Sequence, residues 1–150
     1  MNGPITVKLK RLPHAQGLPL PVRMTAQAAG FDLPAAVSND VILNPGDISL
    51  VPCGFAMAIP PGYEAQVRPR SGLASKHGIT LINSPGTIDS DYRGEVHVPL
   101  INLSRSAFTL ARGTRIAQML VLPVPAVELV EVDDLDETPR GTGGFGHTGH

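Results

Sequence analysis

The sequence lacks most of the features that support disulfide, metal-cluster or nucleic-acid chemistry. Cys53 is the single cysteine among 150 residues, which excludes an internal disulfide framework and a cysteine-based zinc site. Its apolar neighbours predict a buried packing residue. The formal net charge is −1, and no basic tract could neutralise a nucleic-acid backbone. No apolar run approaches the roughly 20 residues that cross a membrane, and the N-terminus lacks the apolar segment of a signal peptide. We therefore expect a cytoplasmic protein that binds neither nucleic acid nor membrane.

Aromatic residues are also scarce, at 4%, so the core is expected to consist of Val, Ile, Leu and Ala. Glycine and proline are plentiful instead, with 16 and 15 residues. This composition favours many short strands joined by tight turns over long helices. The length fits one compact domain.

Alternation of apolar and polar residues, together with short apolar runs next to turn signals, predicts short strands along most of the chain. The clearest are residues 5–11, 41–43, 48–51, 55–59, 63–67, 96–100 and 116–124. One short helix is expected, with Ser71 as its N-cap and Gly78 at its end. Roughly ten short strands with almost no helix are typical of an all-β fold, either a jelly roll or another antiparallel sandwich or barrel.

The C-terminal segment differs from the rest in composition. From Arg140 the chain reads RGTGGFGHTGH, with one large apolar residue, Phe145, among five glycines. Such a segment cannot bury enough surface to fold alone. We therefore divide the chain into a β domain, residues 1–139, and a flexible arm, residues 140–150. The arm could close over a phosphorylated nucleotide, because glycines allow turns that direct N–H groups at an anion. A disordered tail is the alternative.

Three groups of polar residues are candidates for a site within the β domain. Residues 70–72 bring a guanidinium, a hydroxyl and free N–H groups to a helix start, which suits an anion; an ordinary surface arginine is the alternative. Asp89 lies in a turn that also contains Asp91, and a carboxylate there could take a proton from an attacking water. Asp91 itself is better explained as a turn former. Asp32 stands among apolar residues and is either a structural hydrogen-bonding group or part of a site.

In their order along the chain, these segments resemble the five motifs of the trimeric deoxyuridine triphosphate nucleotidohydrolases (dUTPases). The matching segments are residues 29–36, 69–79, 83–95, 115–119 and 140–149. The resemblance implies a jelly-roll homotrimer with three active sites, each built from several subunits. It implies hydrolysis of dUTP to dUMP and pyrophosphate by in-line attack of water on the α-phosphate. This reaction would remove dUTP from the DNA precursor pool and supply dUMP for dTMP synthesis. The implied cofactor is Mg²⁺, bound mainly by the three phosphates and by water.

The resemblance also assigns roles to single residues. Asp89 would be the general base that deprotonates the water, and Tyr92 would pack against the deoxyribose and exclude a 2′-hydroxyl. Four residues would read the uracil edge: Asn83, Thr87, Ile88 and His97. Another four would hold the phosphates: Arg70, Ser71, Gly72 and Gln118. Asp32 would act through water at the metal, or in the hydrogen-bond network of the site.

The arm would complete the site over the bound substrate. Arg140 would reach the terminal phosphate, and Phe145 would stack over the uracil. The remaining contacts would come from Gly146, His147 and Thr148.

Two other functions are compatible with parts of this pattern. A dCTP deaminase shares the fold family but acts on the amino group of the base, and its resemblance to this chain is poorer. A non-catalytic jelly roll that senses nucleotides would keep the pocket, but Asp89 argues against it. Release of pyrophosphate or of ammonia distinguishes the two enzymes.

Overall fold

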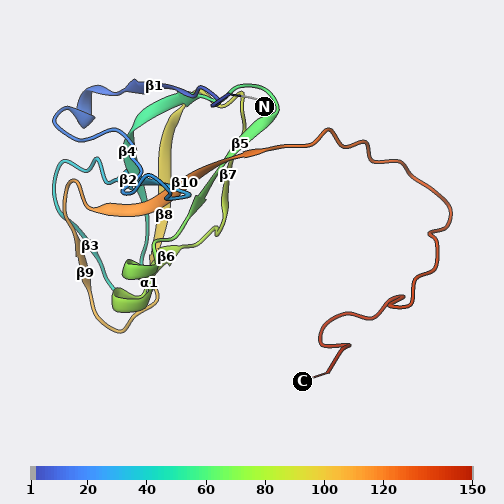
Figure 1. Ribbon diagram of the computed structural model, residues 1–150. Helices are drawn as coiled ribbons and strands as arrows, with labels where there is room; N and C mark the ends of the chain where they lie inside the picture. Colours follow the sequence, from blue (N-terminus) through green and yellow to red (C-terminus); the bar gives the residue numbers. More distant parts are fainter. Residues whose placement is uncertain (1–2, 150) are drawn as a thin grey trace.

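The computed structural model describes residues 3–149 (Figure 1). Residues 1, 2 and 150, which belong to the predicted domain and arm, lie outside the described residues. The elements in this range are β1 (Lys8–Arg11), the 3-10 helix η1 (Pro13–Ala15), β2 (Phe31–Pro34), β3 (Val41–Leu43), β4 (Ile48–Ala58), β5 (Tyr63–Arg68), α1 (Ser71–His77), β6 (Ile79–Leu81), β7 (Gly86–Ile88), β8 (Glu95–Asn102), β9 (Phe108–Leu110) and β10 (Arg115–Pro123). No helix among residues 3–149 is long and apolar enough to span a membrane.

The strands form two four-stranded antiparallel sheets and one two-stranded sheet. The strand orders are β1-β4-β8-β6 in the first, β2-β10-β5-β7 in the second and β3-β9 in the third. Alternate residues of each central strand point into one shared core, as for Val96, Val98 and Leu100 of β8 and for Ala65 and Val67 of β5. The all-β, jelly-roll-like architecture with one short helix is therefore confirmed.

Strand β4 corrects one prediction. Residues 48–51 and 55–59 were expected to be separate strands, but Ile48–Ala58 is one strand of 11 residues. It pairs with β8 from Ile48 to Pro52 and again at Ala56, and from Phe55 onward it also pairs with β1. The pairing with β8 shifts register between Pro52 and Ala56, where Gly54 has a φ of 76°. The chain bends here and changes its main partner, so the proline and glycine do not end the strand.

The boundaries of β1 and α1 also differ from expectation. The first strand begins at Lys8, later than the predicted residue 5. Ser71 is the first helical residue rather than the N-cap, because the backbone of Arg70 is extended and its carbonyl accepts the first helical hydrogen bond, from the Ala74 N–H at 3.1 Å. Gly78 ends the helix in the left-handed conformation, as predicted, with a φ of 64°.

The chain leaves the folded body after β10. Residues 124–149 form neither strand nor helix, and Figure 1 shows this segment running away from the sheets. Its large apolar side chains are exposed, including Leu129, Leu135 and Phe145. The part without regular structure therefore begins at residue 124, earlier than the predicted arm.

Candidate active site

The first candidate pocket is polar and combines β2, β10 and the start of α1. Its volume is about 310 Å³. Four predicted phosphate-binding residues line it, namely Arg70, Ser71, Gly72 and Gln118, whereas Arg140 does not. Gln118 Nε2 donates to the Pro69 carbonyl at 3.0 Å, and Arg70 Nη1 donates to the Arg115 carbonyl at 3.0 Å. These bonds hold two of the side chains in place before any ligand arrives.

Asp32 lines this pocket and contacts two arginines. Its Oδ2 accepts a hydrogen bond from Arg115 Nη1 at 3.1 Å, and its Oδ1 is 3.6 Å from Arg70 Nε. The Asp32 side chain is only 14% exposed. One carboxylate between two guanidinium groups leaves a net positive charge, which suits a polyanion. This environment favours the second predicted role of Asp32, in the hydrogen-bond network of the site.

Arg115 was not predicted as a site residue, although it belongs to the fourth motif. It is the first residue of β10, where the strand pairs with β2 at Pro34. The sequence signal for Arg115 as a site residue was its position immediately before the apolar run 116–124. A charged residue at the end of a strand usually faces outward, where it can meet a ligand. In the structure, the Arg115 side chain donates a hydrogen bond to Asp32.

The second candidate pocket lies at the turn between β7 and β8. Its volume is about 220 Å³. The lining residues are Thr87, Ile88, Asp89, Tyr92, Glu95, Val96 and His97. The predicted nucleoside-binding residues of the β domain are therefore brought together except Asn83, which lies beside Gly86 rather than in the lining. Phe145, which was predicted to stack over the uracil, does not line this pocket.

Tyr92 is fixed by the turn that carries Asp89. The Tyr92 N–H donates to the Asp89 carbonyl at 3.2 Å, and the Tyr92 hydroxyl donates to the Glu95 carbonyl at 2.8 Å. The ring folds back over Gly94 so closely that a Cβ on that residue would lie 2.4 Å from the phenolic oxygen. A glycine is therefore required for this orientation of Tyr92. The ring presents a flat surface to the pocket while remaining 45% exposed.

The two pockets have no lining residue in common. Asp89 belongs to one, whereas Arg70 and Arg115 belong to the other. None of the described arm residues lines either pocket, and the arm makes its hydrogen bonds locally, such as the 2.8 Å bond from Arg140 Nε to the Gly143 carbonyl. The single chain therefore holds the predicted site residues in three separate groups.

Two further observations concern metals and cysteine. Residues 3–149 contain no group of three or more His, Cys, Asp or Glu side chains arranged to hold a metal ion.

Cys53 is buried, as predicted. Burial, with a smaller contribution from the charge of Glu95, raises the pKa of its thiol from 9.0 to about 12.

Comparisons with known proteins identify similar sequences and structures. A family model described as dUTPase matches residues 17–149. The structure of a Staphylococcus bacteriophage 80alpha dUTPase with dUPNHPP is similar with a TM-score of 0.86 and 25% identity, covering 97% of this chain and 99% of that one. A point mutant of the same phage enzyme, with dUpNHpp, gives 0.87 and 24%, again with 97% and 99% coverage.

A more distant match is a point mutant of the dUTPase from phage phi11 of S. aureus. Its TM-score is 0.78 at 22% identity, covering 88% of this chain and 99% of that one. That structure is described as showing the coordination of a structural Mg(II) ion.

Proposed function

Because the chain belongs to the dUTPase family and hydrolyses dUTP to dUMP and pyrophosphate, we propose that Asp89 activates the attacking water in a site completed by neighbouring copies. The observation that carries this proposal is the separation of Asp89 from the arginine-rich pocket within one chain. A substrate that contacts both Asp89 and the arginines must occupy both pockets at once. A second copy of the chain can supply the second pocket.

The proposed reaction is an in-line displacement at the α-phosphorus. Asp89 takes a proton from water while the oxygen of that water bonds to phosphorus. The bond from phosphorus to the bridging oxygen breaks, and pyrophosphate leaves with the bonding electrons. Tyr92 packs against the deoxyribose, so that the α-phosphate lies near the turn that carries Asp89. Positioning and charge neutralisation supply most of the rate enhancement in such transfers.

The arginine-rich pocket is proposed to hold the phosphates. Arg70 can form paired hydrogen bonds to phosphate oxygens, and the N–H groups at the start of α1 add partial positive charge. Asp32 orients both arginines, because it accepts a hydrogen bond from Arg115 and forms an ion pair with Arg70. In this arrangement Gln118 assists, because its amide is already directed to the segment that carries Arg70.

We propose Mg²⁺ as the cofactor, as the Mg(II) site of the phi11 enzyme also suggests. The described residues offer no cluster of acidic or imidazole ligands, so the ion would take its ligands mainly from the phosphates and water. When bound, it would neutralise charge on the phosphate oxygens. Asp32 could contact it through water.

We further propose a homotrimer, supported first by a surface. Exposed Ile48 and Leu50 lie on β4, Ile82 directly follows β6 of the same sheet, and Leu50 is 63% exposed. Side chains of this size gathered on one flat face mark an interaction site rather than a free surface. A closed ring of three copies would cover this face on every subunit.

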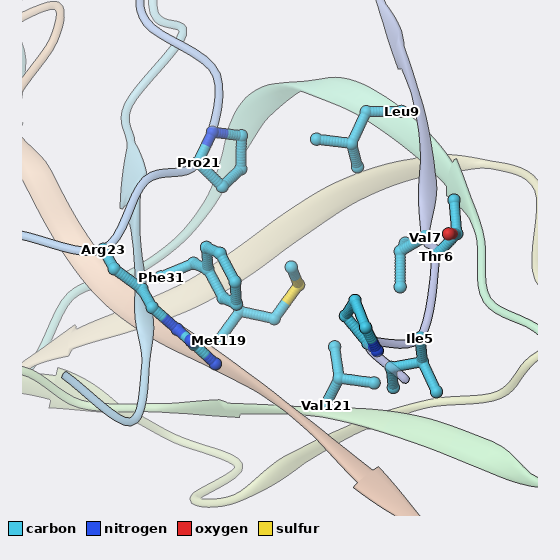
Figure 2. Close-up of a pocket in the computed structure, with 10 residues that line it drawn as sticks. Ile5, Thr6, Val7, Leu9, Pro21, Arg23, Phe31, Met119 and Val121 are labelled. Atoms are coloured by element: carbon cyan, nitrogen blue, oxygen red, sulfur yellow. The ribbon is translucent and has the colours of Figure 1, made fainter. Parts of the chain in front are cut away.

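A second surface is a groove at the N-terminal side of the molecule. Figure 2 shows Ile5, Val7 and Leu9 facing Phe31, Met119 and Val121 across it, with Arg23 beside Phe31. The groove has a volume of about 640 Å³. The exposed segment 127–135, which consists of apolar and acidic residues, has the chemistry to fill it from another copy. Docking there would direct residues 140–150 of one subunit toward the active site of another.

The arm would then close over the substrate, with Arg140 at the terminal phosphate and Phe145 over the uracil. Gly146, His147 and Thr148 would complete the contacts, and exclusion of bulk water would strengthen the charge interactions. We also propose a cytoplasmic location, where the substrate joins the precursor pool for DNA synthesis.

A complementation experiment tests the base and the shared site together. Asp89→Asn and a deletion of residues 140–150 are each expected to lower pyrophosphate release at least about 100-fold. If base and arm come from different copies, random mixed trimers from equal amounts of the two variants should regain about a quarter of the wild-type activity. Asp91→Asn serves as the matched control and should remain active.

Three outcomes would contradict the proposal. An Asp89→Asn variant with full activity would show that Asp89 is not the base. Inactive mixtures, from samples in which mass measurement shows mixed trimers, would show that one copy supplies both groups. Release of ammonia from dCTP would indicate deaminase activity instead.

A further inference from the structure

Glu95 lies where several segments that are distant in sequence meet below Tyr92. Its Oε1 accepts the Gly54 N–H at 3.1 Å and also contacts His14 Nε2. Its Oε2 is 3.4 Å from His97 Nε2, and its side chain is 17% exposed. One carboxylate therefore connects η1, the bend of β4 and the start of β8.

The bend of β4 explains why a carboxylate is needed here. The β4–β8 pairing shifts register between Pro52 and Ala56, so the buried Gly54 N–H is directed at a side chain and not at the neighbouring strand. An unpaired buried N–H is costly. The Gly54 carbonyl is occupied separately, by the Leu12 N–H at 2.9 Å. A carboxylate only accepts hydrogen bonds, so His14 Nε2 must be the donor in its contact with Oε1.

The main chain of the same residue holds Tyr92. The Glu95 carbonyl accepts the Tyr92 hydroxyl at 2.8 Å and His97 Nδ1 at 3.1 Å. The Glu95 side chain is held by Gly54 and His14, and the Glu95 carbonyl in turn holds the Tyr92 hydroxyl. A displacement of the Glu95 backbone would therefore displace the phenol ring.

We propose that Glu95, anchored by Gly54 and His14, is a positioning residue that sets how closely Tyr92 approaches the sugar, and thereby the discrimination of deoxyribose from ribose. The proposal rests on the proposed packing of Tyr92 against the deoxyribose. Discrimination against a 2′-hydroxyl depends on a contact distance, and displacements of about 1 Å in such sites have large kinetic effects. Removal of the anchor should widen the pocket at the sugar.

The first test compares kcat/KM for dUTP and UTP. Glu95→Ala is expected to lower the dUTP:UTP ratio about tenfold, with a larger change in KM than in kcat, because Asp89 lies at the opposite end of the turn. Glu95→Gln should keep the ratio within about threefold, since its amide oxygen still accepts from Gly54. His14→Ala should give an intermediate loss of about threefold. Glu64→Ala removes a half-buried glutamate from β5 and serves as the matched control.

The second test asks whether the effect passes through the tyrosine. Tyr92→Phe removes the hydroxyl that bonds to the Glu95 carbonyl. In this background Glu95→Ala should lower the dUTP:UTP ratio by less than about twofold, because the two changes interrupt one connection. Independent effects that multiply would refute the connection through Tyr92.

Binding of dUMP and UMP, measured by calorimetry, separates this inference from the proposed function because it requires no turnover. Glu95→Ala should lower the dUMP:UMP affinity ratio as it lowers the kinetic ratio. An unchanged ratio in both measurements would overturn the positioning role. If Glu95→Ala does not fold, His14→Ala and Glu95→Gln decide the question by the same ratios. A wild-type protein that prefers dUMP but does not hydrolyse dUTP would contradict the proposed function and leave this inference standing.

Discussion

Asn102, the last residue of β8, is the only buried polar side chain among residues 3–149, and it allows a stability effect to be derived from the structure. Its Nδ2 donates to the carbonyls of Leu43 and Ser106, both at 2.8 Å. Its Oδ1 accepts from the Ser104 N–H at 2.9 Å and from the Ser104 hydroxyl at 2.8 Å. The side chain thereby joins β3, β8 and the turn that precedes β9.

Replacement of Asn102 by Leu keeps a similar shape and removes all four bonds. The Leu43 carbonyl then stays buried without this donor, which costs about 1–3 kcal/mol. The serine groups are partly exposed and regain water, so each of their lost bonds costs about 0.5–1 kcal/mol. We expect a total loss of roughly 2.5–6 kcal/mol, a large part of the typical 5–15 kcal/mol for a folded domain.

Urea unfolding at equal protomer concentrations measures this loss, because assembly also contributes to apparent stability. Asn102→Asp should lose more, since a carboxylate oxygen would face two carbonyls that need a donor. Asn44→Ala, at an exposed position, is the control and should change stability by less than about 0.5 kcal/mol. An Asn102→Leu variant as stable as this control would refute the reasoning.

Three other predictions concern pH, the nucleoside pocket and the arm. Because the raised pKa of the Cys53 thiol, about 12, lies above the 9.0 expected in the unfolded chain, the unfolded state releases this proton first. The Cys53 contribution to the free energy of unfolding is thus complete below pH 9. It should be lost at about 1.4 kcal/mol per pH unit between pH 9 and 12. Urea titrations at several pH values measure this slope, and Cys53→Ala should lack it. Gly94→Ala should push the Tyr92 ring aside and raise KM for dUTP about tenfold with little change in Tm; an unchanged KM would contradict the close approach. Deletion of residues 140–150 should leave the oligomer folded but lower turnover at least about 100-fold, and loss of the oligomer in gel filtration would contradict the role of the arm as a lid.

Much of the fold could be predicted because its signals are local. Alternation in residues 63–67 and 96–100 depends only on which face of a strand is buried, and both strands were found. The strands of three or four residues, such as β6 and β7, are too short to show a period. Strand β4 was divided because Pro52 and Gly54 are turn residues in most contexts, and its change of partner from β8 to β1 is a long-range property.

The candidate site was predictable to the extent that its residues are neighbours in sequence. Residues 70–72 and the turn 86–94 each carry a recognisable group of side chains. The contact between His14 and Glu95 joins residues 81 positions apart, and no local pattern indicates it. The same holds for Arg115 and Asp32, which meet only because β10 pairs with β2.

The distribution of charge between the two pockets supports the proposal that the site is shared between copies of the chain. Asp32 occupies Arg70 and Arg115, whereas Asp89 forms no ion pair with any residue in the described part of the chain. A general base tied to a guanidinium would be a weaker proton acceptor, because the positive charge favours the ionised carboxylate. Separation of the two pockets keeps Asp89 free of the arginines until the substrate, whose phosphates satisfy those arginines, lies between them. In the proposed site, the capacity of Asp89 to accept a proton is thus preserved by the same separation of pockets that would make the site depend on more than one subunit.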